Sequence, residues 1–276
     1  MGRKRIYLNK GDKFNYLSFI EEIYSNISEK RMGLFECNCG DINYYPINNV
    51  RNNNIKRCKK CKLNIQCEAS RKYKVIDIFE KFNTEEESYI LGIFFADGTI
   101  RGNDNTLSIS LVEDDVQILN DIKNIIQPTK PLHYCNILTG RNQYRLSISH
   151  KNIREKFIKM GCIRNKSLIL KYPDKPVSDK DFIRGYIDGD GHISNKNLSI
   201  MGTEEFLRSI HKIFSNVLKK DLKIRMYRKK DTTSNTWQMS ISYKKDRIVL
   251  LDWLYSNSNL KLDRKYNSYL KHNSLI

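Results

Sequence analysis

The segment Ile90-Leu91-Gly92-Ile93-Phe94-Phe95-Ala96-Asp97-Gly98 returns in altered form as Ile183-Arg184-Gly185-Tyr186-Ile187-Asp188-Gly189-Asp190-Gly191. Both copies end in Asp-Gly and carry small residues four positions apart, Gly92 and Ala96 in the first and Gly185 and Gly189 in the second. Residues four apart lie on one face of an α-helix, where small side chains let two backbones approach closely. We therefore expect two packed helices that place Asp97 and Asp190 side by side at their C-terminal ends.

The chain around these two segments repeats as well. Asp190 follows Asp97 by 93 positions, and Met239-Ser240-Ile241-Ser242 follows Leu146-Ser147-Ile148-Ser149 by the same interval. Leu107-Ser108-Ile109-Ser110 has a counterpart in Leu198-Ser199-Ile200-Met201, and Asn165-Lys166-Ser167 has one in Arg264-Lys265-Tyr266. Because self-similarity at a fixed interval indicates repeated structural units, the sequence predicts two copies of a module of about 95 residues.

Hydrophobic periodicity predicts the same order in both modules: helix, two strands, helix, two strands, helix. The fold class is therefore α+β, with two tandem αββαββα modules at 84–172 and 173–276. Thr84 with Glu87 predicts a capping box at the first motif helix, and Ser178 with Asp181 predicts the same device at the second. The expected elements are 84–97, 99–112, 114–127, 130–149 and 151–160, then 179–190, 192–201, 203–219, 222–243 and 245–256.

An N-terminal unit over residues 1–67 precedes a basic linker at 68–83. Apolar residues at helical spacing predict an amphipathic helix within residues 12–30. Two cysteine pairs follow, and their spacing suits a tetrahedral zinc site made of two knuckles, with Gly40 permitting a tight turn. Unrelated free thiols are the alternative, and Cys67 is a possible substitute ligand. The expected zinc ligands are Cys37, Cys39, Cys58 and Cys61.

Asp97 and Asp190 are the candidate catalytic residues. Two adjacent carboxylates suit hard divalent cations such as Mg²⁺, which stabilise charge on the attacking and leaving oxygens of a phosphodiester. The alternative is that Asp-Gly only ends each helix, since glycine is common just past a helix end. Two copies at matching helix ends favour metal binding.

The Asp-Gly-terminated helices, the order of elements and the trailing basic residues resemble a two-motif LAGLIDADG homing endonuclease, over roughly residues 84–276. The resemblance implies a monomer whose two sheets form a pseudo-twofold saddle over double-stranded DNA. It also implies at least two Mg²⁺ ions at Asp97 and Asp190 with the adjoining Gly98 and Gly191. The first copy departs by carrying Phe95 where the second has Asp188, a position that does not bind metal.

Lys166 and Lys265 occupy equivalent positions near the end of each module. In the resembling family, basic residues here lie beside the metal site, where a cation offsets negative charge developing on the phosphate. Ordinary solvated lysines are the alternative, and neighbouring basic residues leave the choice of residue open.

The strands alternate apolar and polar residues, so one face of each sheet packs on helices and the other is free to contact a DNA groove. An ordinary solvated face is the alternative for any single residue. The expected outward-facing strand residues are Ser108, Ser110, Gln143, Arg145, Ser147, Ser199, Lys223, Arg225, Gln238, Ser240 and Ser242. The expected loop contacts are Arg101, Asn103, Asn105, Arg141, Asn142, Asn195, Lys196 and Arg228.

Composition indicates a polyanionic partner. The chain of 276 residues has 49 Lys and Arg against 31 Asp and Glu, a formal charge of +18, and neutralising phosphates with such side chains releases counterions. Neither motif segment approaches the roughly 20 apolar residues of a membrane span. With no apolar run after Met-Gly-Arg-Lys-Arg, we expect a reducing compartment, either a bacterial or phage-infected cytoplasm or an organelle matrix.

The sequence thus predicts a site-specific, Mg²⁺-dependent homing endonuclease that makes double-strand breaks and spreads its intron or gene. Two alternatives share the expected fold: an RNA maturase that binds intron RNA, and a DNA-binding regulator without catalysis. The carboxylate pair favours the enzyme, because a binding protein gains nothing from two carboxylates beside phosphates.

Overall fold

A computed structural model describes residues 7–23, 31–100, 104–137, 140–163, 169–175, 177–228 and 236–273. The chain divides into two compact units, Met1–Tyr73 and Lys74–Ile276. Each unit has its own hydrophobic core. Among the described residues, no helix has the length and apolar composition needed to span a bilayer.

The N-terminal unit is an antiparallel sheet followed by two helices. Its strands β1 (Lys13–Phe14), β2 (Leu17–Ile23), β3 (Met32–Cys37) and β4 (Ile42–Pro46) pair in chain order. The helices are α1 (Ile47–Arg51) and α2 (Lys59–Lys72). The Phe35 side chain lies at the centre of the core, where its ring contacts the Phe19 ring edge-on at 5.4 Å between centroids.

The helix predicted within residues 12–30 is wrong for the described part, because residues 13–14 and 17–23 form strands. Over so short a run, the spacing of the apolar residues fits both the 3.6-residue period of a helix and the two-residue period of a strand. Leu17 and Phe19 are both buried, which follows the two-residue alternation of a strand. A register shift between Phe19 and Glu21 then breaks the alternation. The apolar residues after this shift therefore follow the spacing expected of a helix. Residues 24–30 of the predicted helix lie outside the described residues.

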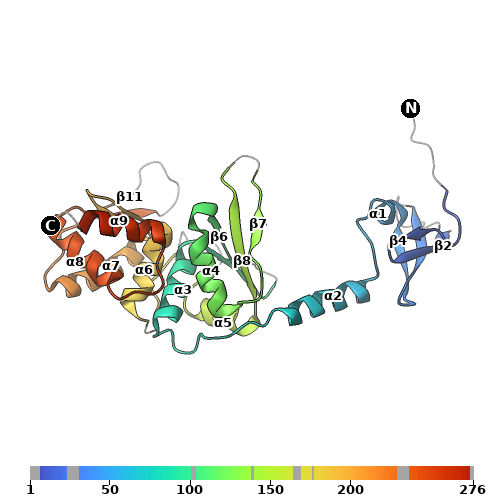
Figure 1. Ribbon diagram of the computed structural model, residues 1–276, viewed down its shortest axis with the longest axis horizontal. Helices are drawn as coiled ribbons and strands as arrows, with labels where there is room; N and C mark the ends of the chain where they lie inside the picture. The colour runs from blue at the N-terminus through green and yellow to red at the C-terminus, as the bar shows by residue number, and fades with distance from the viewer. Residues whose placement is uncertain are drawn as a thin grey trace. The chain divides into compact units, whose positions relative to one another are not determined.

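The second unit contains the two predicted modules, and the α+β prediction with two αββαββα modules is confirmed (Figure 1). The first module consists of α3 (Glu85–Ala96), β5 (Gly98–Ile100), β6 (Thr106–Val112), the 3-10 turn η1 (Glu113–Asp115), α4 (Val116–Ile126), β7 (His133–Cys135), β8 (Gln143–Ser149) and α5 (Lys151–Lys159). The second consists of α6 (Asp179–Asp190), β9 (Gly191–Ile193), β10 (Leu198–Gly202), α7 (Glu204–Leu218), β11 (Arg225–Arg228), β12 (Trp237–Ile241) and α8 (Lys244–Tyr255), and an unpredicted helix α9 (Asp263–Asn273) follows.

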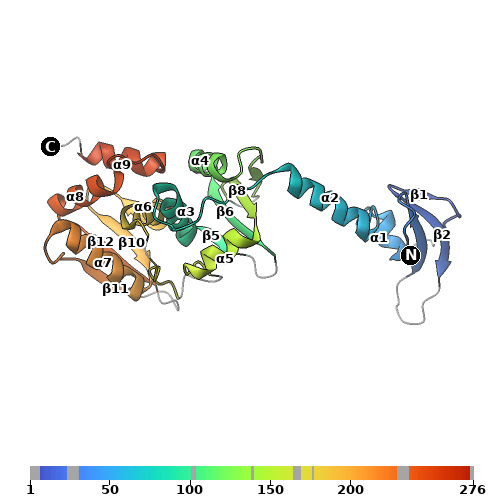
Figure 2. The ribbon, with the colours of Figure 1, turned by 90° about the horizontal axis from the view of Figure 1, so that it is seen from below.

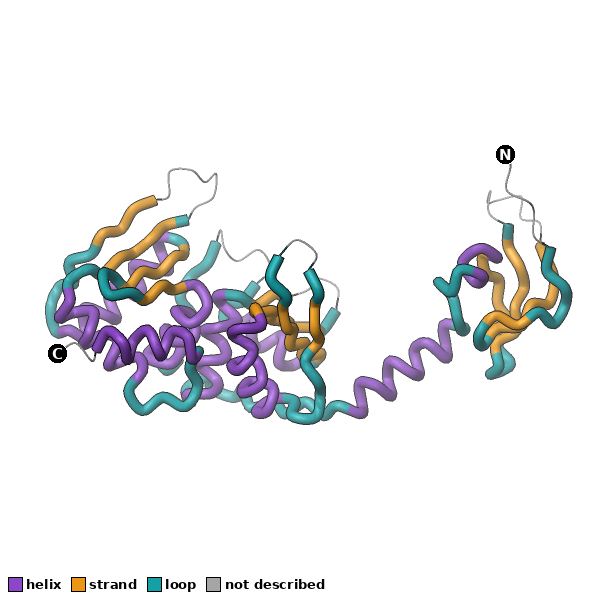
Figure 3. Tube along the Cα trace, turned by 45° about the horizontal axis from the view of Figure 1, so that its top comes forward, coloured by secondary structure: helices purple, strands orange, loops and turns teal. Residues whose placement is uncertain are grey.

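The two sheets have matching topology. The strand order is β5-β6-β8-β7 in the first module and β9-β10-β12-β11 in the second, and all neighbours are antiparallel. Helices cover one face of each sheet (Figure 3). The apolar residues of the repeated strands, including Ile109, Ile148, Ile200 and Ile241, are buried in the shared core on that face.

Helices α3 and α6 lie against each other between the two sheets (Figure 2). A Cβ atom added at Gly92 would lie 2.1 Å from the Phe182 carbonyl oxygen, and one at Gly185 would lie 2.2 Å from that of Tyr89. Phe182 follows Tyr89 by 93 positions, as Gly185 follows Gly92. The two contacts are therefore reciprocal, which is the property of a twofold interface.

The start of α3 is held by the predicted capping box. The Thr84 hydroxyl accepts a hydrogen bond from the Glu87 N–H, and the Glu87 carboxylate accepts one from the Thr84 N–H. The Glu80, Lys81 and Asn83 N–H groups also donate to Glu87. Burial alone raises the pKa of Glu87, but these donors outweigh it and leave the pKa lowered.

The capping box predicted for α6 is wrong. Ser178 is the N-cap residue, but its side chain caps no backbone N–H. The hydroxyl instead donates to the Asp181 carboxylate at 2.5 Å, while the Ser178 N–H donates to the Ser88 hydroxyl of the first module at 3.0 Å. The start of α6 is thus bonded to α3 as well as to itself.

A buried arginine joins the two modules. Arg184 has no exposed surface. Its guanidinium donates to the Glu85 carboxylate at the start of α3, to Asp181, and to the carbonyls of Leu254 and Leu260. A buried charge is tolerated only when its donors are satisfied in this way. A second link pairs Arg264 of α9 with Asp115 of the first module at 2.9 Å.

We expect the substitution Gly92→Ala to destabilise the second unit. Gly→Ala within a helix normally adds up to about 1 kcal/mol of stability, whereas overpacking costs about 1–3 kcal/mol, and here the clash is with backbone. Urea unfolding of Gly92→Ala beside Asn120→Ala, an exposed site on α4, measures the difference. A more stable Gly92→Ala protein would contradict the close approach of α3 and α6.

Candidate functional site

The two motif carboxylates emerge at adjacent helix ends. Asp97 is the C-cap residue of α3, and Asp190 is the last residue of α6. A Cβ atom added at Gly189 would lie 2.7 Å from the Asp97 Oδ2 atom and 2.3 Å from the Ala96 Cβ atom. Because Gly189 directly precedes Asp190, the Asp97 carboxylate lies against the backbone that carries Asp190.

The glycines after the two aspartates are required sterically. A Cβ atom added at Gly98 would lie 2.5 Å from the Phe94 carbonyl oxygen, and one at Gly191 would lie 2.6 Å from that of Ile187. Each strand therefore leaves its helix through a turn too tight for a side chain. This turn keeps the aspartate at the junction between helix and sheet.

Tyr186 lies in the field of both carboxylates. Its side chain is buried, and its hydroxyl donates to the Met201 carbonyl at 2.8 Å. Burial raises the pKa of Tyr186 well above its usual value, and the charges of Asp190 and Asp97 raise it further. One phenol thus responds to both carboxylates, as expected if the two are close neighbours.

Asp188 has a structural role that Phe95, its counterpart in the first copy, cannot have. The buried Asp188 carboxylate accepts hydrogen bonds from the Tyr89 hydroxyl at 2.7 Å, the Tyr255 hydroxyl at 2.5 Å and the Leu262 N–H at 2.8 Å. Burial raises the pKa of Asp188 although all three donors favour the charged form. Phe95 instead packs edge-on against Phe182 at 5.1 Å.

Lys265, predicted to lie beside the metal site, is buried at the end of α6. Its ammonium donates to the Ile187 carbonyl at 3.0 Å and to the Gly191 carbonyl. Burial lowers the pKa of Lys265, while the charges of Asp188 and Asp97 oppose that shift. The lysine thus caps the negative end of the helix that carries Asp190. The predicted counterpart Lys166 lies outside the described residues.

The open face of the first sheet collects the predicted polar residues. Ser110 faces Arg145 across β6 and β8, and the Arg145 Nε–H donates to the Ser110 hydroxyl at 2.9 Å. Thr99, Ser108 and Ser147 form another row across the sheet. Ser108 is only 6% exposed, because its short side chain lies between neighbouring strands. The predicted residues on or beside this face that the structure describes are Asn105, Ser108, Ser110, Arg141, Gln143, Arg145 and Ser147.

The open face of the second sheet is built in the same way. Ser199 faces His192 on one side and Ser240 on the other. Both serines are largely buried, and the Asn197 amide donates to the Ser240 hydroxyl at 3.3 Å. Gln238 lies on this face, whereas Arg228, predicted in a loop, is the last residue of β11 and is opposite Trp237 on the other face. The predicted residues with described side chains outside the strands are Asn195, Lys196, Lys223 and Ser242, and only the backbone of Arg225 is described. Arg101 and Asn103 lie outside the described residues.

Several residues at these sites escaped the sequence analysis. Thr99 and His192 occupy equivalent positions two residues after Asp97 and Asp190, and both side chains are exposed on the open faces. The alternation of the short strands that follow each Asp-Gly could have revealed them. Arg247 was also missed; its guanidinium donates to the carbonyls of Asn195 and Lys196 and so holds the β9–β10 loop.

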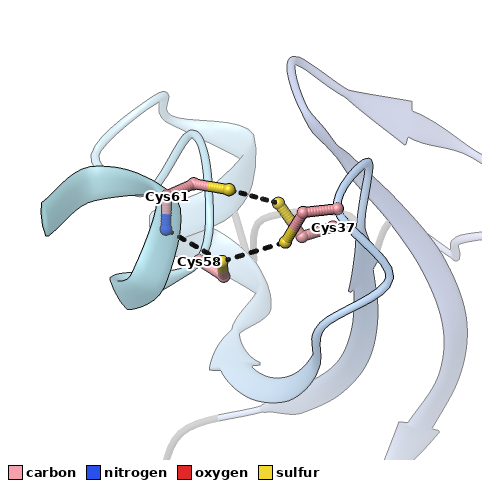
Figure 4. Close-up of side chains that lie close together, drawn as sticks. Cys37, Cys58 and Cys61 are labelled. Atoms are coloured by element: carbon pink, nitrogen blue, oxygen red, sulfur yellow. Dashed lines mark hydrogen bonds between the residues drawn. The ribbon is translucent and has the colours of Figure 1, made fainter. Parts of the chain in front are cut away.

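The four predicted zinc ligands come together. The sulfur atoms of Cys37, Cys39, Cys58 and Cys61 all lie within 4.8 Å of one another. Figure 4 shows the Cys61 thiol, from α2, directed at Cys37 at the end of β3, with 4.0 Å between the sulfurs. The sulfurs of Cys39 and Cys58 are 3.6 Å apart. Tetrahedral zinc with Zn–S bonds of about 2.3 Å places sulfurs about 3.8 Å apart, so the four thiols fit the ion.

The local backbone also suits a thiolate cluster. Gly40 has a φ of +83°, and its N–H donates to the Cys37 carbonyl, which closes a tight turn that contains Cys37 and Cys39. Cys58 is the N-cap residue of α2, and its sulfur accepts from the Cys61 N–H at 3.4 Å. Burial raises the pKa of the Cys58 thiol to about 12, whereas hydrogen bonds with Cys39 and Cys58 outweigh burial and lower the pKa of Cys37 to about 7. A bound cation would favour the thiolate form of all four cysteines. The Cys67 side chain is not among those described.

We expect the purified protein to contain about one equivalent of zinc, and Cys61→Ser to lose it, because a structural site needs all four ligands. Elemental analysis after exhaustive dialysis measures the content. Cys135→Ser, which alters a free cysteine on β7, is the matched control and should retain zinc. Full zinc content in Cys61→Ser would rule out the four-cysteine site.

Comparison with known proteins yields similarity in structure only. No protein-family model matches the chain, and no curated protein matches it. The structure of I-DmoI in complex with DNA and Ca is similar at 19% identity and a TM-score of 0.45, over 68% of this chain and 97% of that one. Full-length DUF199/WhiA from Thermatoga maritima is similar at 18% identity and a TM-score of 0.43, over 71% of this chain and 63% of that one. The LAGLIDADG meganuclease I-AabMI bound to uncleaved DNA is similar at 12% identity and a TM-score of 0.42, over 68% and 91%.

Proposed function

We propose that the protein is a site-specific homing endonuclease that makes Mg²⁺-dependent double-strand breaks in DNA and thereby promotes the mobility of its intron or gene. The observation that carries the proposal is the apposition of Asp97 and Asp190 at the ends of two packed helices, one from each module. A pair of phosphodiester bonds on opposite strands needs a site with the same twofold relation.

The two carboxylates provide oxygen ligands of the kind that Mg²⁺ prefers. When bound, the ions would activate water and stabilise charge on the scissile phosphates. Asp97 and Asp190 would hold them from opposite modules, next to the backbone of Gly98 and Gly191. Lys265 would keep the end of α6 in place, because its ammonium bonds the Ile187 and Gly191 carbonyls on either side of Asp190.

The open faces of the two sheets would bind the DNA duplex. Both faces begin directly after the Asp-Gly turns, so a duplex lying along them brings its backbone to the carboxylates. Their polar side chains, including Arg145 and Gln238, can donate to base edges or phosphates. The formal charge of +18 supports the same partner.

The N-terminal unit would extend the DNA contact. Lys56, Arg57, Lys59 and Lys62 line a groove of about 450 Å³ beside the cysteine cluster. The Arg57 guanidinium stacks over the half-exposed Tyr16 ring at 4.2 Å. Through Cys58 and Cys61, zinc would tie the segment that carries these basic residues to the cysteines at the end of β3, since the unit has only a small apolar core.

We expect Asp97→Asn and Asp190→Asn each to abolish double-strand cleavage while changing DNA affinity by less than about threefold, since the amide keeps the shape but loses the charge that holds Mg²⁺. Wild type and variants are incubated with a randomised duplex pool and Mg²⁺, and the ends are sequenced.

Binding of the recovered target is measured in Ca²⁺ as the control for folding. Full cleavage by either variant would refute the metal site. Binding without cleavage by the wild type would instead favour the DNA-binding regulator. Preferential binding of intron RNA over the duplex would favour the maturase.

Removal of residues 1–73 should weaken binding of the same target by about tenfold or more and lower its salt dependence, because phosphate contacts dominate affinity. Cleavage should persist at saturating protein. The full-length variant Lys56→Ala/Lys59→Ala/Lys62→Ala separates charge from loss of the unit. Unchanged affinity and footprint in both proteins would exclude the N-terminal unit from the interface.

A further inference from the structure

The two halves of the carboxylate site differ at the first side chain that follows each Asp-Gly turn. Thr99 holds this position in β5 and His192 holds it in β9. Each lies between a glycine and a core isoleucine, Ile100 in one strand and Ile193 in the other. Both side chains therefore lie on the open face, and both are exposed.

The register of the sheets places the two side chains identically. Thr99 is opposite Ser108, and His192 is opposite Ser199. Asp190 ends α6 and His192 is the middle residue of β9, so only Gly191 separates the two. The exposed imidazole therefore lies on the open face where the sheet begins after Asp190, and the Lys265 ammonium bonds the Gly191 carbonyl between them.

A second difference lies one helical turn before each aspartate. Tyr186 precedes Asp190, whereas Ile93 precedes Asp97 at the equivalent position. The Tyr186 hydroxyl is anchored on the Met201 carbonyl of β10, and Ile93 is buried in the core. The Asp190 half therefore has two polar ring side chains that the Asp97 half lacks.

We propose that His192 contacts the scissile phosphate served by Asp190 and makes the two strands of the target break at unequal rates. The inference rests on the proposed endonuclease function. The imidazole carries its ring N–H farther from the backbone than threonine carries its hydroxyl, so it can donate to a phosphate oxygen that the threonine of the other half does not reach. A hydrogen bond to an ionised phosphate is charge-assisted and about twice as strong as a neutral one.

The pseudo-twofold relation supplies a reciprocal experiment. His192→Thr gives the Asp190 half the side chain of the other half, and Thr99→His does the converse. Each strand of the target recovered from the randomised duplex pool is labelled with a different fluorophore at its 5′ end. Single-turnover rates are then measured for both strands in Mg²⁺, with affinity in Ca²⁺ and melting temperature recorded for every variant.

We expect His192→Thr to slow one strand by about tenfold, as loss of a hydrogen bond to a charged group predicts, and to bring the two rates closer together, so that less nicked DNA accumulates than with the wild type. Thr99→His should accelerate the opposite strand. His192→Gln, which keeps an N–H donor of similar reach, should give an intermediate rate. A residue that only supports the fold would slow both strands alike and lower the melting temperature.

Unchanged strand rates in His192→Thr, or an equal fall of both, would overturn the proposal while leaving the endonuclease intact. If the wild type cuts no DNA in the pool, the endonuclease proposal fails and this inference fails with it. Cleavage by the wild type with a strand ratio of one would refute His192 alone.

Discussion

The close approach of the α3 and α6 backbones is the constraint on which the rest of the second unit depends. Gly92 and Gly185 each lie where an added Cβ atom would be less than 2.5 Å from a carbonyl oxygen of the other helix. Contact at this distance fixes rotation and translation of the two helices together. It therefore fixes the position of both C-terminal aspartates and the direction in which β5 and β9 leave. Within the part of the chain that the structure describes, no other pair of elements determines the carboxylate site so directly.

The backbones of α3 and α6 are related by a pseudo-twofold axis, but several of their equivalent side chains differ in kind. Arg184 and Asp188 are buried charges on α6, and their counterparts Leu91 and Phe95 on α3 are apolar. Each charge bonds the segment between α8 and α9 as well as α3. Removing one partner of such a network leaves an unpaired buried charge, so the network fixes one arrangement of α6 more firmly than apolar packing does. The two halves of the unit thus share a backbone plan but differ in the side chains that support it.

Much of this architecture could be predicted from the sequence because the chain contains two copies of the same module. The repeat interval assigned the order of elements, and the small residues of the motif located the helix contact. The cysteine spacing likewise predicted a thiol cluster, and the structure brings together the sulfurs of Cys37, Cys39, Cys58 and Cys61. What escaped was information held in tertiary contacts. Residues 17–23 were assigned to a helix because their pairing with β3 is invisible in a short apolar run.

The remaining failures have the same origin. Ser178 has the sequence of a capping residue, but its hydroxyl bonds Asp181 and its N–H bonds Ser88 of the other module. Helix α9 is strongly polar, and its place is set by the Arg264–Asp115 pair and by Lys265 at the end of α6. Apart from Asp181, none of these partners is close in sequence. Periodicity predicts an element reliably when its own residues decide it, and poorly when a distant partner does.

Placing Asp97 and Asp190 at the C-terminal ends of α3 and α6 runs against the stability of the unit. The carbonyl dipoles make a helix C-terminus negative, and a carboxylate there is unfavourable by about 0.3–1 kcal/mol, whereas a cation is favourable by a similar amount. The repulsion between two neighbouring carboxylates adds to that cost. Lys265 relieves it for α6 by bonding the terminal carbonyls, but it is buried behind the turn rather than in front of the carboxylates. A divalent cation on the open side would offset both the repulsion between the carboxylates and the unfavourable interaction of each carboxylate with its helix dipole. The arrangement is therefore costly for folding alone, and this cost supports the proposed metal-binding role of the pair over that of two ordinary helix ends.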